Sequence, residues 1–236
     1  MTPDTLAQAI GATWPTAARH RAGPWIIREG RGGGKRVSAA TADAEWQDTD
    51  IPVAEQAMEA LGQPPLFLIR NGDDPLDQAL QSRGYRVVDP VVAYAAPVAL
   101  LADPPAPPMA AFPHWPPLAL CETLWAEGGV GPVRVAVMHR VTGPKCAILS
   151  RVKDRPTGTA FAAVHDGVAM LHALVVMPAA RRQGSAHNIL RAAGFWAQQN
   201  GAAVLAAAVT QANTPARALY ASLGMQAVGQ YHYRQR

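Results

Sequence analysis

The stretch Met170-Leu-His-Ala-Leu-Val-Val-Met-Pro-Ala-Ala-Arg-Arg-Gln-Gly-Ser-Ala186 decides the fold of this chain. Its apolar run from Leu171 to Met177 is short, rich in Val and Leu, and ended by Pro178, which is typical of a buried strand. Beyond the basic loop, apolar residues recur at the spacing of one buried helix face. They are Ala186, Ile189, Leu190, Ala193 and Ala197. We therefore predict a strand, a short basic glycine loop and a helix, in that order.

The loop between strand and helix has the chemistry of an anion-binding site. The first turn of a helix leaves backbone N–H groups unpaired, and the helix dipole favours negative charge there. Gly184 lets a ligand approach the backbone, while Arg181 and Arg182 supply charges that pair with phosphate oxygens. The alternative is a tight strand-to-helix turn whose arginines are merely solvated.

Two motifs carry a resemblance to a known family. The spacing Arg181-x-x-Gly184-x-Ala186 resembles the pyrophosphate-binding signature of the GNAT superfamily of N-acetyltransferases. Farther along, Asn213 followed by Tyr220 and Gly224 is similar to the second signature of that family. The two motifs occur in the family's order, and together they cover roughly residues 160 to 233. We take this order as the strongest functional signal in the chain.

The resemblance implies that acetyl-CoA binds along the strand end and the loop. Asn213 also has a structural explanation, because Asn-Thr-Pro is a strong helix start with Asn as its cap, and the two roles are compatible. In the family, a backbone N–H of this strand stabilises the oxyanion, and the position maps to about Val175 or Val176. The implied cofactor-binding residues are Leu174, Val175, Val176, Arg181, Arg182, Gln183, Gly184, Ser185, Ala186 and Asn213.

Tyr220 and His172 are the candidate catalytic residues. Tyr220 matches the family's phenol near the thioester sulfur, and a phenol with a pKa of about 10 can protonate a leaving thiolate. His172 precedes Pro178 at a position where many family members carry a Glu that deprotonates the amine, and imidazole accepts a proton near neutral pH. Strand alternation places His172, Leu174 and Val176 on one face. The alternatives are a packing role for Tyr220 and a hydrogen-bonded core residue for His172.

We predict a GNAT-type acyltransferase that moves an acetyl group from acetyl-CoA to a primary amine by direct transfer in a ternary complex. No Cys stands near either motif, which favours direct transfer. The alternative is a non-catalytic CoA-binding GNAT-like module with a regulatory or interaction role, because the family's Glu is replaced at His172. The acceptor, a small-molecule or peptide amine, is left open, since the family varies its acceptor loops on a common cofactor site.

One segment of the N-terminal half resembles a segment of the C-terminal half, as in an internal repeat. The segments 80–87 and 220–227 share the plan of helix, glycine stop and strand, and each follows a strand and an Asn-containing turn. Leu80 stands where Tyr220 would be, and the first copy has no Arg-x-x-Gly-x-Ala loop. We therefore predict a degenerate copy that scaffolds the fold or shapes the acceptor pocket and does not hold the cofactor.

These features predict a domain plan and a fold class. Residues 1–103 form the degenerate GNAT-like half, the proline-rich residues 104–108 a stiff linker, and residues 109–236 the acetyl-CoA-binding domain. The fold class is α/β (α+β), a mixed, mostly antiparallel central sheet flanked by helices, in two tandem GNAT-like halves. The glycine-rich segment 30–34 is predicted as a hairpin turn rather than a phosphate loop, because no helix start follows it.

Composition excludes several other classes of protein. The net charge of +4 is modest and lacks the concentrated basic face of a nucleic-acid binder. Two isolated cysteines are too few for a disulfide framework or a zinc site, so no metal is expected. The segment 87–101 is apolar but broken by prolines and too short for a bilayer, and no secretory signal is visible. We expect a cytoplasmic monomer or homodimer without nucleic-acid or membrane partners.

Overall fold

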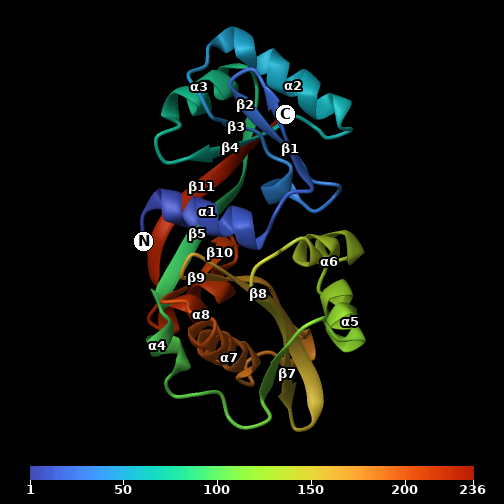
Figure 1. The fold of residues 1–236 in the computed structure, drawn as a ribbon, viewed down its shortest axis with the longest axis vertical. Coiled ribbons are helices and arrows are strands. Elements are labelled where there is room, and N and C mark those ends of the chain that lie inside the picture. The colour runs from blue at the N-terminus through green and yellow to red at the C-terminus, as the bar shows by residue number, and fades with distance from the viewer.

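The structure, a computed structural model, describes residues 1–236 (Figure 1). It has a three-stranded sheet of order β1-β2-β3 and an eight-stranded sheet of order β4-β11-β5-β10-β9-β8-β7-β6. The helices are α1 Pro3–Thr13, α2 Ile51–Ala60, α3 Asp74–Ser82, α4 Val98–Ala102, α5 Ala119–Glu127, α6 Pro132–His139, α7 Ser185–Gln199 and α8 Thr214–Ser222. The strands are β1 Ala18–Ala22, β2 Trp25–Glu29, β3 Thr41–Ala42, β4 Leu66–Arg70, β5 Arg86–Pro97, β6 Ala111–His114, β7 Lys145–Val152, β8 Arg155–His165, β9 Val168–Val176, β10 Val204–Thr210 and β11 Gln226–Gln235.

The large sheet is mixed and mostly antiparallel, as predicted. Only β9 and β10 run parallel; every other neighbouring pair in it is antiparallel. Alternate residues of its strands pack on opposite faces. Leu171 and Leu205 face a core formed with α4, α7 and α8, whereas Met170 and Ala206 face α1. The second face continues under α5 and α6 around Phe161.

The two halves of the chain exchange strands within this sheet. The segments β4-α3-β5 and β10-α8-β11 have the same order, which agrees with the predicted tandem plan. β11 lies between β4 and β5, and β5 lies between β11 and β10, so each segment inserts its last strand between the strands of the other. Figure 1 shows β5 and β11 side by side in the middle of the molecule, where they join its upper and lower parts. The proposed domain boundary stays a prediction, because residues on both sides of it build one sheet.

The hairpin predicted around residues 30–34 is wrong. The hairpin of this region joins β1 to β2, and the glycine segment leads into a 3-10 turn over Lys35–Val37. Close packing explains the difference, since a Cβ at Gly33 would meet Val137 Cγ2 at 2.6 Å. The turn carries Arg36 toward β9, which matters for the site described below. None of the helices combines the length and the apolar character needed to cross a bilayer.

Candidate active site

The parallel pair β9 and β10 opens into a wedge halfway along its length. The paired residues run from Val168–Val204 to Leu171–Ala207, and no pair follows although both strands continue. Beyond this point the β10-facing edge of β9 has no strand partner. The predicted cofactor residues Leu174, Val175 and Val176 lie on this free edge, and all three are partly exposed. The structure thus brings them together on the part of β9 that has no partner on the β10 side.

The loop after β9 presents a continuous row of free backbone donors. No protein group accepts a hydrogen bond from the N–H groups of residues 182–187. Gly184 is the N-cap of α7 at φ 86°, in a left-handed conformation that favours glycine, and no side chain caps the helix. Nothing lies within 4 Å of the position that a Gly184 Cβ would take. Unpaired donors at an open helix start form a site for an anion.

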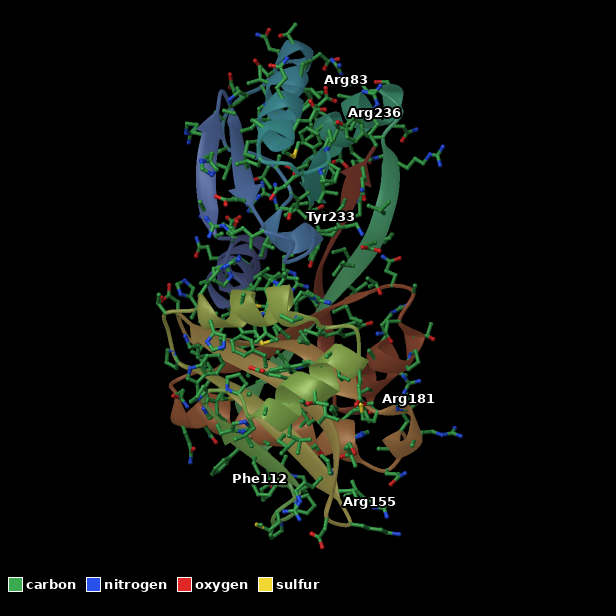
Figure 2. All side chains as sticks on the ribbon, turned by 90° about the vertical axis from the view of Figure 1, so that its right-hand side faces the viewer. Arg83, Phe112, Arg155, Arg181, Tyr233 and Arg236 are labelled. Atoms are coloured by element: carbon green, nitrogen blue, oxygen red, sulfur yellow. The ribbon has the colours of Figure 1, made fainter.

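The side chains of this loop take different roles. Arg181, Arg182 and Gln183 are exposed, and Gln183 donates from its amide to the carbonyl of Ala179. Figure 2 shows Arg181 in the lower half of the molecule, remote from Arg83 at the top. Ser185 is buried instead, and its hydroxyl donates to Thr157 Oγ1 at 2.9 Å. The serine therefore anchors the helix start to β8, and only its backbone N–H is free for a ligand.

A bulge in β9 breaks the alternation expected of the strand. Ala173 has a φ of 48°, and the pairing with β8 shifts register between Phe161 and Thr159. His172 therefore stacks on Phe161 at a centroid distance of 6.2 Å, while Leu174 packs into the core under α7 and α8. The prediction that His172 and Leu174 share one face is wrong, because the extra residue in the bulge shifts the alternation and the side chains after it point to the opposite face.

His172 is a buried, fully hydrogen-bonded imidazole. Its Nδ1 lies 3.1 Å from Arg36 Nη1, and its Nε2 lies 2.9 Å from Thr13 Oγ1. A guanidinium only donates, so Nδ1 accepts and Nε2 carries the proton. Burial, with the nearby charges of Arg36 and Arg134, holds the pKa of His172 well below its usual value. Both ring nitrogens are occupied in this arrangement.

Tyr220 lies on α8, on the opposite side of the sheet from His172. Its side chain is buried in the core under α7 and α8, with its ring centroid 5.6 Å from that of Tyr94. Its hydroxyl makes no hydrogen bond to the protein, whereas Tyr94 Oη accepts one from Arg217 Nε at 3.3 Å. Burial raises the pKa of Tyr220 to about 12, which keeps the phenol protonated at neutral pH.

Asn213 caps α8 as its sequence suggested. Its side-chain oxygen accepts a hydrogen bond from the N–H of Ala216 at 3.1 Å. The side chain is exposed, and the acceptor oxygen still has a free lone pair, so the cap leaves room for a second contact. The predicted contact to a cofactor stays a prediction.

A cavity of about 840 Å³ lies on the α1 side of the sheet. Residues of α1, β2, β4 and β11 line it, together with Arg36 from the 3-10 turn. Through Arg36 it adjoins His172, the last residue before the bulge in β9. No sequence pattern predicts this cavity, because its walls come from both halves of the chain. No group of three or more His, Cys, Asp or Glu side chains could hold a metal ion.

Comparison with known proteins identifies the C-terminal part of this arrangement. Residues 118–225 match the Acetyltransferase (GNAT) family. The chain carries a GNAT acetyltransferase domain. The matched residues include the wedge, the loop before α7 and Tyr220. The prediction of a GNAT-type acyltransferase is confirmed, and acetyl transfer to amines is the general activity of this family.

Relatives extend the likeness beyond the GNAT domain to nearly the whole chain. An uncharacterized N-acetyltransferase of Bacillus subtilis (strain 168), YobR, is 26% identical over 97% of this chain and 96% of its own length. A GCN5-related N-acetyltransferase from Kribbella flavida has a similar structure, with a TM-score of 0.73, 19% identity and coverage of 100% of this chain and 96% of that one. A tandem GNAT protein from the clavulanic acid biosynthesis pathway has a TM-score of 0.63 at 12% identity, covering 99% of this chain and 88% of that one. These structures confirm the predicted fold.

Proposed function

We propose that this protein transfers an acetyl group from acetyl-CoA to a primary amine by direct transfer in a ternary complex. The observation that carries the proposal is the row of unpaired N–H groups over residues 182–187, at the start of α7 and beside the open edge of β9. Such a row, with two exposed arginines next to it, is suited to a pyrophosphate. The unpaired part of β9 runs from this loop back to His172, and its Leu174 packs against the core that contains Tyr220.

The residues present fit acetyl-CoA. The loop from Arg181 to Ala186 would hold the pyrophosphate through its backbone donors and arginines, and the free edge at 174–176 would hold the pantetheine arm. Bound acetyl-CoA would supply a thioester, whose acyl carbon is open to attack by an amine. In the family-derived assignment, an N–H of Val175 or Val176 faces the oxygen on which negative charge develops.

Tyr220 is the group that we assign to the departing thiolate. Its hydroxyl is free of protein partners, and its pKa of about 12 means that the proton is present throughout the neutral range. Donation of this proton to the sulfur would let CoA leave, and because a thiolate is a fairly good leaving group we expect this general acid to contribute about 10²-fold or less. The partly exposed wedge also gives solvent a route to replace the proton.

His172 has a different role in the proposal. Its Nδ1 lone pair faces Arg36, and its depressed pKa makes the imidazole a weak base. We therefore assign to it the positioning of Arg36 and α1 beside the wedge, and its catalytic role as a base stays an untested prediction. The attacking amine then enters from the cavity on the α1 side and meets the thioester at the wedge.

The test combines cofactor binding with an amine panel. We expect calorimetry to detect acetyl-CoA binding and thiol release to rise above background with at least one class of amine. Mass spectrometry of the protein with acetyl-CoA and no amine should show no acetylated enzyme, as direct transfer requires. Tight binding with only background thiol release across the panel would contradict the proposal and identify a CoA-binding module.

A further inference from the structure

The cavity on the α1 side has an unbalanced cluster of positive charge. Arg19, Arg28 and Arg36 line it, and none of them forms an ion pair. Arg28 donates to the carbonyl of Ala39 only, and burial together with the charges of Arg19 and Arg70 lowers its pKa to about 10. Buried charge without a partner is costly unless a ligand compensates it.

Two polar atoms in this cavity wall are enclosed and make no hydrogen bond. They are Arg36 Nε and the hydroxyl oxygen of Tyr231. Arg36 uses another of its nitrogens to contact His172, and the phenols of Tyr231 and Tyr233 lie beside it, so the guanidinium is held in place at the cavity wall without a carboxylate partner. Native proteins rarely leave such buried polar atoms unsatisfied, and a functional role or a bound water or ion usually explains the exceptions.

The acidic residues of the cavity do not neutralise this cluster. The Asp73 carboxylate accepts from the backbone N–H and the Nε of Arg70, and the Asp77 carboxylate binds Arg234 and His232. The remaining acids, Asp4 and Asp74, are exposed and form no ion pair. The cavity wall therefore holds two paired carboxylates, two exposed ones, and three guanidinium groups without an ion-pair partner, of which Arg36 adjoins His172.

We propose that the amine acceptor also carries a carboxylate, which binds to Arg36, Arg28 and Arg19. This inference rests on the proposed function and specifies its substrate class. Guanidinium groups bind carboxylates through paired, charge-assisted hydrogen bonds, and the Tyr231 hydroxyl supplies a further donor. Because Arg36 touches a residue of the wedge itself, the carboxylate and the reacting amine must be close together in the acceptor. An α-amino acid carries both groups on one carbon and satisfies this requirement.

The test measures binding of the acetylated acceptor, so it does not depend on turnover. N-acetyl amino acids are compared by calorimetry with their carboxamides, which have the same shape without the charge. We expect the carboxylates to bind at least about 10-fold more tightly, equivalent to about 1.4 kcal/mol. Equal binding of the acid and the amide would overturn the inference, and so would tighter binding of an N-acetylated amine that bears a phosphate.

Variants locate the binding group. Arg36→Gln should reduce the preference for carboxylate to within about 3-fold, whereas Arg31→Gln, at an exposed arginine paired with Glu29 outside the cavity, should keep it. Arg19→Gln changes an exposed residue, so it keeps the test valid if the Arg36 variant does not fold. It should lower the preference for carboxylate over carboxamide about 2- to 5-fold. A folded Arg36→Gln protein with an unchanged preference would contradict the assignment.

Acetyl-CoA affinity separates this inference from the proposed function. It should be the same in the wild type and in all three variants, because the cavity and the loop before α7 lie on different parts of the sheet. Acetyl-CoA binding and amine acetylation without any preference for carboxylates would overturn the inference alone. Absence of acetyl-CoA binding in the wild type would overturn the proposed function.

Discussion

Helices α7 and α2 begin at corresponding places in the two halves, yet their first turns differ in chemistry. α7 connects β9 to its parallel neighbour β10, and α2 follows β3, beside which Ala40 forms a parallel bridge to Phe67 in β4. The α7 start is uncapped and flanked by Arg181 and Arg182. The α2 start follows a capping box in which the Asp50 carboxylate accepts from the N–H of Gln47 at 2.8 Å.

The α2 start does not favour an anion. A capping box closes the 3-10 turn before it, and the carboxylates of Asp43, Glu45 and Asp48 add negative charge there. The second helix of each half repeats the contrast, since α8 carries Tyr220 where α3 carries the fully buried Leu80. The comparison teaches that the helix start of one half has free donors beside arginines, whereas its counterpart lies beside carboxylates, so only the first suits an anionic ligand.

Separating the halves should have the largest effect. A fragment of residues 107–236 lacks β5, which pairs with both β10 and β11, so two long strand edges would be exposed. We expect this fragment to be insoluble alone and soluble when co-expressed with residues 1–106, measured by copurification. A monomeric fragment 107–236 that folds and binds acetyl-CoA would contradict the shared-sheet account and support independent domains.

Blocking the uncapped helix start should abolish cofactor binding. Gly184→Trp would place a side chain in the open space beside the free N–H groups, and we expect acetyl-CoA affinity by calorimetry to fall about 100-fold or more. Gly201→Trp is the matched control, because Gly201 has a φ of 78° and open space beyond the other end of the same helix. Equal losses in the two variants would indicate strain rather than a blocked site.

Removing the Tyr220 hydroxyl, which has no counterpart on α3, should affect catalysis alone. Tyr220→Phe keeps the ring contact with Tyr94, so acetyl-CoA affinity should stay within a few fold while kcat falls by about 10²-fold or less. Tyr85→Phe, in the N-terminal half, removes a hydroxyl that donates to Glu55 and should leave kcat unchanged. An unchanged kcat in Tyr220→Phe would show that Tyr220 has only a packing role.

The smallest effect concerns the pH dependence of stability at His172. Its pKa is depressed in the folded state, so its stabilising contribution is present above the unfolded value of about 6.5 and is lost as the pH falls toward the folded pKa. The loss is at most about 1.4 kcal/mol per pH unit. His172→Asn keeps an acceptor for Arg36 and removes the titration. The difference in unfolding free energy between wild type and variant should shrink from pH 7.5 to pH 5.5; a constant difference would refute the assignment.

Sequence patterns predicted the features that depend on neighbouring residues, and they missed the contacts between residues far apart in the chain. The strand, glycine loop and helix of residues 170–199 follow from apolar spacing within a few turns of chain, and the cap at Asn213 from its neighbours. The bulge at Ala173 was missed because an alanine carries no signal for a left-handed φ. The contact of Arg36 with His172 joins residues 136 positions apart, so no pattern of spacing could reveal it. The one available signal was the run of glycines before Arg36, which disfavours a strand over residues 35–38.

Hydrogen exchange at the two helix starts tests the central claim most directly. Peptide-resolved exchange is measured with and without acetyl-CoA, which reports on backbone amides without any substitution. The account predicts slower exchange on cofactor addition for residues 182–187, whose N–H groups are unpaired, and no change for residues 47–53 at the start of α2. Protection at the α2 start, or none at residues 182–187, would contradict it.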